Sequence, residues 1–177
     1  LIPQIVYYFY SYMTLVNQKE ITLGEEVNFT IPSGNFGNCL AGYIAKSMGL
    51  PVKQFIVASN KNNILTDFFR TGKYDANREF YKTNAPAMDI LVKKYMECLN
   101  QEGVYEVDQD VLDKLQKEFK AGYLNEDEVL NEIKFCFHHT GYLLDTHTAI
   151  GYGVYRRYKE ESNDDTKTIL LSTASPY

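Results

Sequence analysis

The sequence has 177 residues, of which 45% are apolar, and a net charge of -5 with a pI near 5.2. This length suits one domain with a buried core, and the scattered lysines and arginines form no basic stripe of the kind that binds nucleic acid. No apolar run approaches the roughly 18 residues of a membrane-spanning helix, and no signal peptide is recognisable. We therefore predict a globular cytoplasmic protein without a membrane or nucleic-acid partner.

The first sixty residues predict a helix followed by a βαβ unit. Apolar residues spaced by three and four predict a helix over 1–17, with Ile2, Ile5, Phe9, Met13 and Val16 on one face. Strands are expected at 27–31 and 53–59, and a helix over 38–48 is closed by Gly49 and Pro51. Such a unit implies two parallel strands joined by a right-handed crossover.

The remaining residues predict mostly helices and one final strand. Helices are expected at 64–70, from Pro86 to about Leu99, over 108–121 with Phe119 on the apolar face, from a capping box at Asn125 to Gly141, and over 148–159. The last strand covers 168–172 after an acidic loop. The fold class predicted is α/β, with a three-layer α/β/α, Rossmann-like parallel sheet.

The segment IPSGNFGN, residues 31–38, lies between the first strand and its helix. Gly34 and Gly37 allow positive φ and close backbone approach, and backbone N–H groups at a helix start attract anions such as phosphate. The spacing matches neither the P-loop nor the dinucleotide fingerprint. A plain turn without a ligand is the alternative.

This loop resembles the phosphate-binding loop of threonine synthase, a pyridoxal-phosphate enzyme of fold type II, the tryptophan synthase β-like family. Further segments resemble the same family in the same order: residues 1–10, 58–68, 86–90, 144–151 and 172–176. The resemblance therefore covers most of the chain, and residues 1–177 are interpreted as a single partial domain, a C-terminal-side fragment of a longer enzyme.

The resemblance implies conversion of O-phospho-L-homoserine and water to L-threonine and phosphate. The cofactor would be pyridoxal 5'-phosphate. The backbone of Gly34, Asn35, Phe36, Gly37 and Asn38 would hold its phosphate, and the hydroxyl of Thr173 would bond its pyridine nitrogen. A hydroxyl there draws less electron density from the substrate than a carboxylate partner would.

The chain departs from the family in three places. No segment resembles the motif of the Schiff-base lysine, so we expect no catalytic residue here and no activity of this piece alone. Residues 91–97 lack the usual Ser-Ser-Asn run, and Thr146 stands in place of a proline. Alternatives are another fold type II lyase such as threonine dehydratase, or a catalytically dead module that binds phosphate.

Other polar residues have simpler interpretations. His138, His139 and His147 are not spaced as metal ligands, so no metal site is predicted. Asp145 with His147 is either an acid/base dyad or, more simply, a helix cap. Lys46 is expected to reach solvent, and Cys39, Cys98 and Cys136 are predicted to be buried free thiols. The aromatic side chains of the first helix suggest a surface covered by the missing N-terminal portion, or self-association of the fragment.

Overall fold

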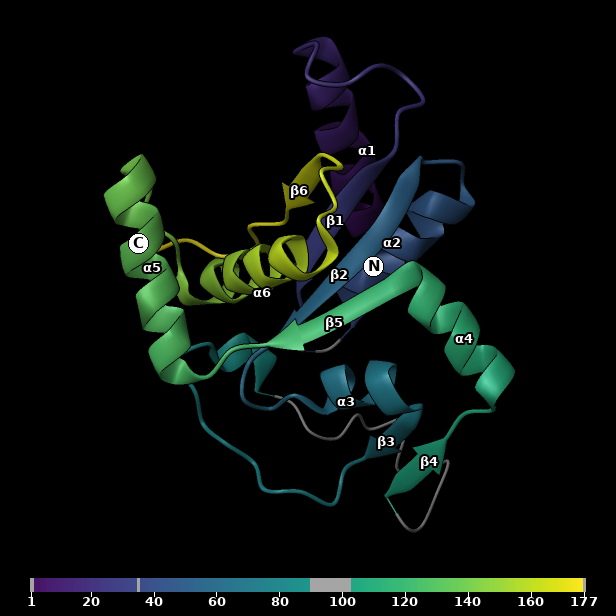
Figure 1. Ribbon diagram of the computed structural model, residues 1–177, viewed down its shortest axis with the longest axis vertical. Coiled ribbons are helices and arrows are strands. Elements are labelled where there is room, and N and C mark those ends of the chain that lie inside the picture. Colours follow the sequence, from purple (N-terminus) through teal and green to yellow (C-terminus); the bar gives the residue numbers. More distant parts are fainter. Residues whose placement is uncertain (1, 35, 90–102, 177) are drawn as a thin grey trace.

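The computed structural model describes residues 2–34, 36–89 and 103–176. Its centre is a four-stranded, fully parallel sheet in the order β5-β2-β1-β6. The strands are β1 (Val27–Pro32), β2 (Val52–Ser59), β5 (Phe119–Tyr123) and β6 (Thr168–Leu170). The predicted βαβ unit is present as β1, α2 (Gly37–Ser47) and β2 (Figure 1).

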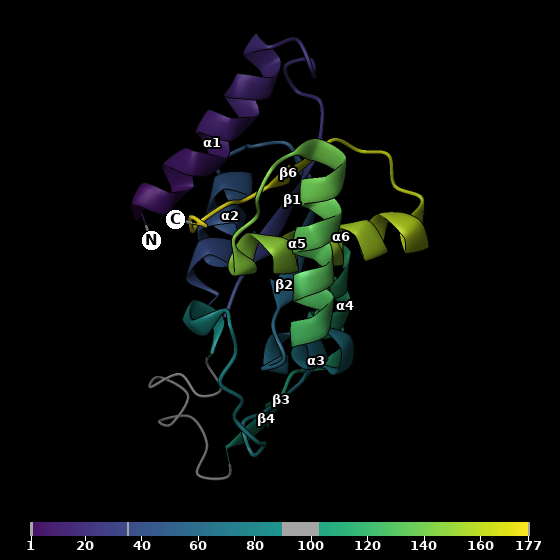
Figure 2. The same ribbon diagram turned by 90° about the vertical axis from the view of Figure 1, so that its left-hand side faces the viewer.

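Helices cover both faces of this sheet, as the α/β/α prediction requires. Helices α1 (Ile2–Asn17) and α2 lie on one face, whereas α5 (Glu126–Thr140) and α6 (Thr146–Ser162) lie on the other (Figure 2). Each face has its own buried cluster, one containing Phe29, Phe55 and Val57 and the other Ile56 and Ala58. Because side chains alternate along β2, its residues contribute to both clusters.

The first helix packs differently from its predicted apolar face. Tyr8 and Tyr12 are fully buried, whereas Ile2 is 78% and Met13 40% exposed. The ring of Tyr8 lies 4.8 Å from that of Phe29. A Cβ built on Gly42 of α2 would lie 2.7 Å from the Tyr8 ring. Ile5, Phe9 and Val16 of the predicted face do pack against this core, but Tyr8 and Tyr12 are the most deeply buried residues of the helix.

The predicted helix over 108–121 is wrong at its carboxyl end. Helix α4 (Gln109–Glu118) stops before Phe119, which begins strand β5. The ring of Phe119 stacks on Phe55 at 5.3 Å and on Phe69 at 5.2 Å. Pairing with β2 and this stacking outweigh a local pattern that suits a helix. Gly122 lies in β5 and allows α6 to approach this strand closely. A Cβ built on Gly122 would lie only 2.9 Å from the Val154 side chain.

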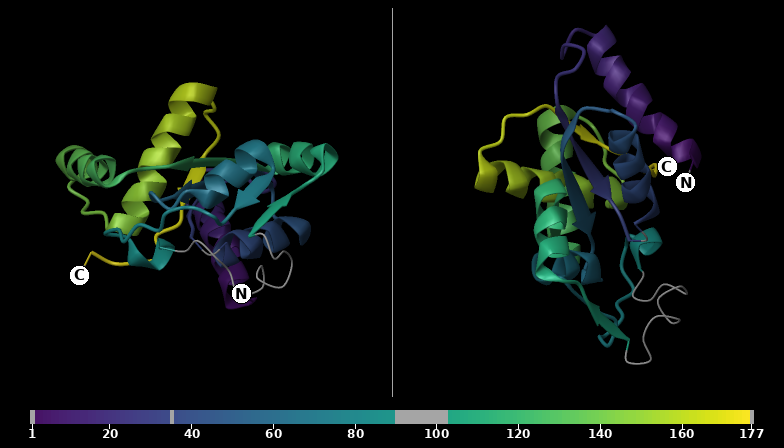
Figure 3. Two further views of the ribbon diagram at one scale, coloured as in Figure 1. Left: turned by 90° about the horizontal axis from the view of Figure 1, so that it is seen from below. Right: turned by 90° about the vertical axis from the view of Figure 1, so that its right-hand side faces the viewer.

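The segment between β2 and α4 contains short elements. Helix α3 (Ile64–Thr71) leads into β3 (Lys73–Asp75), which pairs antiparallel with β4 (Val104–Glu106), a ribbon absent from the sequence prediction. The ribbon lies beyond α3, at the end of the molecule away from α1 (Figures 1 and 3). Pro86 begins only the 3-10 turn η1 (Pro86–Met88), and the rest of the predicted helix lies outside the described residues.

Candidate functional site

The carboxyl ends of β1, β2 and β6 meet at one edge of the sheet because the three strands are parallel and adjacent. Backbone hydrogen bonds continue slightly beyond the strands: Ser33 N–H donates to the Ala58 carbonyl at 2.9 Å, and Leu171 N–H to that of Thr30 at 3.0 Å. The polar segments that follow these strands therefore leave the sheet at the same edge.

The turn from β1 into α2 has a left-handed residue, and it is Phe36, with φ 62°. The prediction that Gly34 and Gly37 supply positive φ is wrong, since neither has it. Asn35 lies outside the described residues. The N–H of Phe36 donates to Ser33 Oγ at 3.0 Å and closes the turn.

Aromatic packing explains why a bulky residue adopts this conformation. The Phe36 ring lies 5.7 Å from the Phe69 ring and 6.0 Å from the Phe119 ring. A left-handed backbone costs a non-glycine residue about 1–2 kcal/mol, which buried aromatic contacts offset. The structure of the turn therefore depends on β5 and α3, which lie far from it in the sequence.

Gly34 is required by close approach, as the sequence suggested, although the neighbour is protein backbone. A Cβ at Gly34 would lie 2.6 Å from the Cα of Met88, in η1. The 3-10 turn thus packs directly on the loop. Any larger residue at position 34 would push the two segments apart.

Helix α2 begins at Gly37 with features that suit an anion. Its N-cap residue, Phe36, makes no side-chain cap hydrogen bond, and its first turn contains no acidic residue. Its N-terminal N–H groups and dipole are therefore oriented toward the sheet edge without a charged competitor from the helix itself. Tyr8 supports this turn: its hydroxyl proton is shared between the Asn38 carbonyl oxygen at 2.8 Å and Asn38 Oδ1 at 3.0 Å. Burial raises the pKa of Tyr8, so its hydroxyl remains a donor.

A hydrogen-bond network after β2 holds the segment that carries η1. The carboxylate of Asp89 accepts bonds from Asn60 Nδ2 at 2.7 Å, Asn62 Nδ2 at 3.0 Å and Thr83 Oγ1 at 2.8 Å. Asn60 and Asn62 are 1% and 5% exposed, so their amides would be costly to leave unpaired. The sequence indicates a turn over 60–63, but it does not indicate that these asparagines bind Asp89.

The first turn of α6 lies beside both segments. Asp145 caps the helix by accepting bonds from the N–H of His147 at 2.8 Å and of Thr148 at 3.1 Å, so the cap interpretation is confirmed. His147 Nε2 accepts the N–H of Ala87 at 3.3 Å, and its Nδ1 lies 3.4 Å from Asp145 Oδ1, so the capping carboxylate also contacts this ring. Thr173, just past β6, is exposed at the same edge.

The other candidate residues have structural roles. In the described part of the chain no group of three histidine, cysteine or acidic residues could hold a metal, and no helix could span a membrane. His139 Nδ1 bonds the Phe135 carbonyl at 2.8 Å. Cys39 and Cys136 are buried free thiols as predicted, whereas Cys98 lies outside the described residues. Lys46 pairs with Glu118 instead of extending into solvent.

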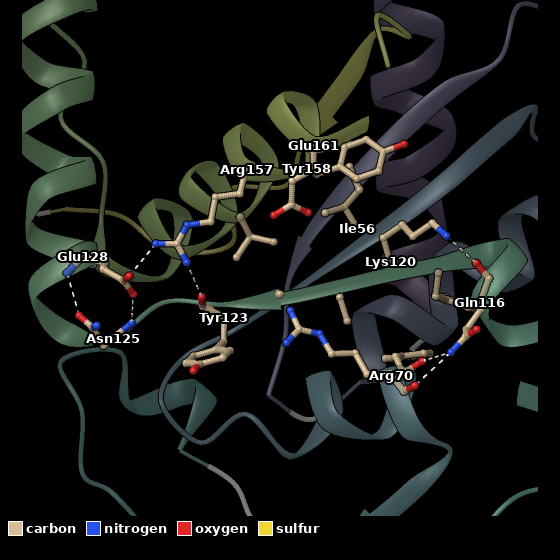
Figure 4. Close-up of a pocket in the computed structure, with 15 residues that line it drawn as sticks. Ile56, Arg70, Gln116, Lys120, Tyr123, Asn125, Glu128, Arg157, Tyr158 and Glu161 are labelled. Carbon is tan, nitrogen blue, oxygen red and sulfur yellow. Dashed lines mark hydrogen bonds and ion pairs between the residues drawn. The ribbon is translucent and has the colours of Figure 1, made fainter. Parts of the chain in front are cut away.

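A groove of about 520 Å³ runs along β5, away from this edge (Figure 4). Several of its polar side chains are engaged with the protein: Arg157 bonds Glu128 at 2.7 Å and the Tyr123 carbonyl at 3.2 Å, and Lys120 bonds the Gln116 carbonyl at 2.9 Å. Neither Gly34 nor Thr173 lines it. We therefore locate the candidate site at the carboxyl edge of the sheet and treat the groove as a flank of β5.

Comparisons with known proteins show what the whole chain is similar to. No family model matches the chain. It is 36% identical over its full length to threonine synthase-like 1 of Homo sapiens and 33% identical to the threonine synthase of Schizosaccharomyces pombe, with 99% of the chain covered. These matches cover 26% and 41% of the two relatives. The crystal structure of pyridoxal-phosphate-bound threonine synthase from Brucella melitensis superposes with a TM-score of 0.88 and 34% identity, over 99% of this chain and 40% of that one.

These comparisons confirm the resemblance and the fold class predicted from the sequence. They also show that the chain spans only about a quarter to two fifths of the curated relatives that it matches. The individual site residues stay a prediction.

Proposed function

We propose that this chain, which is homologous over its whole length to part of the threonine synthases, is the cofactor-binding portion of a pyridoxal-phosphate lyase. The complete protein would convert O-phospho-L-homoserine and water to L-threonine and phosphate in the cytoplasm. Residues 1–177 would form one partial domain, and an N-terminal portion of the same protein would supply the Schiff-base lysine, whose motif is absent from this sequence.

The observation that carries this proposal is the start of α2, with no acidic residue in its first turn, at the carboxyl edge of a parallel sheet, where ligands of such sheets bind. The cofactor's phosphate fits this position because it needs several N–H donors and no nearby carboxylate. We assign its binding to the backbone of residues 34–38, with Phe36 and Gly34 shaping the turn. Since the Phe36 N–H bonds Ser33 Oγ, that group would have to exchange partners on binding.

Thr173 would contact the other end of the cofactor. It follows β6, the strand next to β1, and its exposed position leaves it accessible to a ligand at this edge. Bound pyridoxal phosphate supplies the electron sink for chemistry at the amino-acid carbons. A neutral hydroxyl at the ring nitrogen would moderate that sink more than a carboxylate could. The residues present therefore fit the group.

The test uses the full-length protein that contains this chain, loaded with pyridoxal phosphate. We expect phosphate release from O-phospho-L-homoserine. Replacing Thr173 by alanine should slow it by about 10-fold, the effect of losing one hydrogen bond, whereas Thr173→Ser should retain most of the rate.

Three other results would overturn the proposal in different ways. Ammonia release from L-threonine without phosphate release would indicate a dehydratase. Cofactor binding with neither reaction would indicate a binding module. Failure to bind pyridoxal phosphate at all would leave the turn as a structural feature only.

A further inference from the structure

A chain of three polar side chains connects α6 to the end of β6. Asp145 is 7% exposed and Thr148 2%, and the Thr148 hydroxyl donates to Asp145 Oδ2. Thr148 Oγ1 also lies 3.1 Å from the hydroxyl oxygen of Ser172. Because the single proton of the Thr148 hydroxyl is used on the carboxylate, Ser172 is the donor in this second bond, which is shorter than the 3.5 Å from Ser172 Oγ to its other acceptor, the Ala174 carbonyl. The chain therefore runs from Ser172 through Thr148 to Asp145.

These three hydrogen-bonded side chains hold the backbone just after it leaves the sheet. The last backbone bond to the sheet is that of Leu171 N–H to the Thr30 carbonyl, at 3.0 Å. Residues 172–176 are exposed, so little packing fixes them. The Ser172 side chain, one residue before Thr173, is thus an anchor of the backbone between the sheet and the proposed cofactor contact.

The buried carboxylate makes this anchor strong. Asp145 accepts two backbone N–H bonds at the start of α6, which fix its orientation before Thr148 binds to it. Hydrogen bonds to an ionised acceptor are stronger than neutral ones, and bonds in a chain polarise one another. Ser172 is therefore held by a rigid part of the fold, the capped end of a 17-residue helix.

We propose that Asp145 is a positioning residue: acting through Thr148 and Ser172, it fixes the backbone that carries Thr173 in place for its contact with the cofactor. This inference rests on the proposed function for the identity of the ligand at Thr173. It assigns Asp145 an indirect role, since its carboxylate is buried beneath the chain of hydroxyls and does not itself reach the ligand.

The experiment compares Thr148→Val, which removes the hydroxyl but keeps the side-chain shape and the backbone cap, with Thr148→Ser, which restores it. Thr71→Val is the control, because the Thr71 hydroxyl also bonds within a helix, to the Asp67 carbonyl at 2.8 Å, but far from this edge. The protein is the full-length chain. If Thr148→Val fails to fold, Ser172→Ala breaks the same connection at an exposed position.

The first measurement is hydrogen exchange of the peptide 168–176 in protein without cofactor. We expect exchange there to quicken by about 3- to 10-fold in Thr148→Val, as for the loss of one hydrogen bond, with wild-type rates in Thr148→Ser and Thr71→Val. The peptide covering β1 should not change. Unchanged exchange at 168–176 would overturn the inference, and this result does not depend on whether the protein binds pyridoxal phosphate.

The second measurement is the absorption spectrum of bound pyridoxal phosphate. Thr148→Val should shift its band in the same direction as Thr173→Ala, and Thr148→Ser should restore it. Faster exchange with an unshifted band would overturn the positioning role, because the backbone would then have loosened without affecting the contact. Failure of every variant and the wild type to bind the cofactor would refute the proposed function, while the exchange rates still decide whether the three residues anchor Thr173.

Discussion

The backbone N–H of Phe36 donates to the hydroxyl of Ser33 at 3.0 Å and holds Phe36 in a left-handed conformation with φ 62°. The Phe36 ring meanwhile packs against Phe69 and Phe119. One residue thus combines a strained backbone with a partly buried side chain at the start of α2. Substitutions that separate these two properties test this turn.

At position 36, glycine should be more stable than alanine, which reverses the usual order. Both substitutions lose the ring, at a cost of about 3–5 kcal/mol, but only alanine keeps the left-handed penalty of roughly 1 kcal/mol. Denaturant unfolding of Phe36→Gly and Phe36→Ala measures the difference. Phe80, which is 48% exposed and has no positive φ, is the control position, where alanine should equal or exceed glycine. The usual order at both positions would contradict the strain.

Replacing Gly34 by alanine should weaken cofactor binding and loosen η1. The new Cβ would lie 2.6 Å from the Met88 Cα, and overpacking of this kind typically costs about 1–3 kcal/mol. Titration with pyridoxal phosphate should show the loss. Gly141→Ala is a suitable control, since Gly141 has positive φ but no atom within 4 Å of a built Cβ. Gly141→Ala should lower the stability of the protein without lowering its affinity for pyridoxal phosphate. Equal affinities of Gly34→Ala and Gly141→Ala would argue against the contact between Gly34 and Met88.

Tyr8→Phe should lower the free energy of unfolding by about 1 kcal/mol, because the hydroxyl loses its two acceptors on Asn38 while the ring packing remains. The neighbouring Tyr7 is 61% exposed, so Tyr7→Phe should have no measurable effect. Chemical denaturation of both variants checks the prediction. Similar midpoints for the two would mean that the hydroxyl of Tyr8 does not stabilise the first turn of α2.

Asp164 should make the fold sensitive to acid. Burial favours its protonated form, but hydrogen bonds from Lys53 Nζ at 2.7 Å, Thr166 and Tyr158 hold its pKa well below the ordinary value of 3.8. Because the pKa of Asp164 is lower in the folded than in the unfolded state, its carboxylate contributes fully to stability at pH values above the unfolded-state pKa. This contribution declines as the pH falls below 3.8 and vanishes below the folded-state pKa.

Asp164→Asn should therefore cost about 2–3 kcal/mol near neutral pH and progressively less below pH 4. Unfolding followed across this pH range measures the difference from wild type. Asp165, whose side chain is 92% exposed, is the matched control, and Asp165→Asn should leave stability unchanged. If the loss of unfolding free energy in Asp164→Asn stays constant down to pH 3, the stability of the fold does not depend on the ionisation of Asp164.

Local patterns were sufficient for the βαβ unit, the capping box of α5 and the cap of α6. Each depends on residues close in sequence: the apolar alternation of β1, the bonds between Asn125 and Glu128 at 2.7 and 3.0 Å, and Asp145 with the two residues after Thr146. Such signals need no distant partner. The position of the site at one edge followed from the parallel sheet, because parallel strands end together.

Long-range contacts decided the features that sequence reasoning missed. Strand β5 forms because Phe119 pairs with and stacks on Phe55, 64 positions earlier, where the local pattern alone suits a helix. The β3–β4 ribbon likewise pairs Tyr74 with Tyr105, 31 positions later. Pairing energy of this kind is absent from any local window.

The sequence by itself determined the family, the parallel α/β core and the glycine-rich turn at the start of α2, because these follow from ordered motifs and short-range periodicity. Only the tertiary structure decided that Phe36 rather than a glycine takes the left-handed position, that Gly34 faces Met88, and that Asp145 reaches Ser172 through Thr148. The physical reason is that each depends on the packing of side chains from elements far apart in the chain, which becomes defined only when the layers assemble.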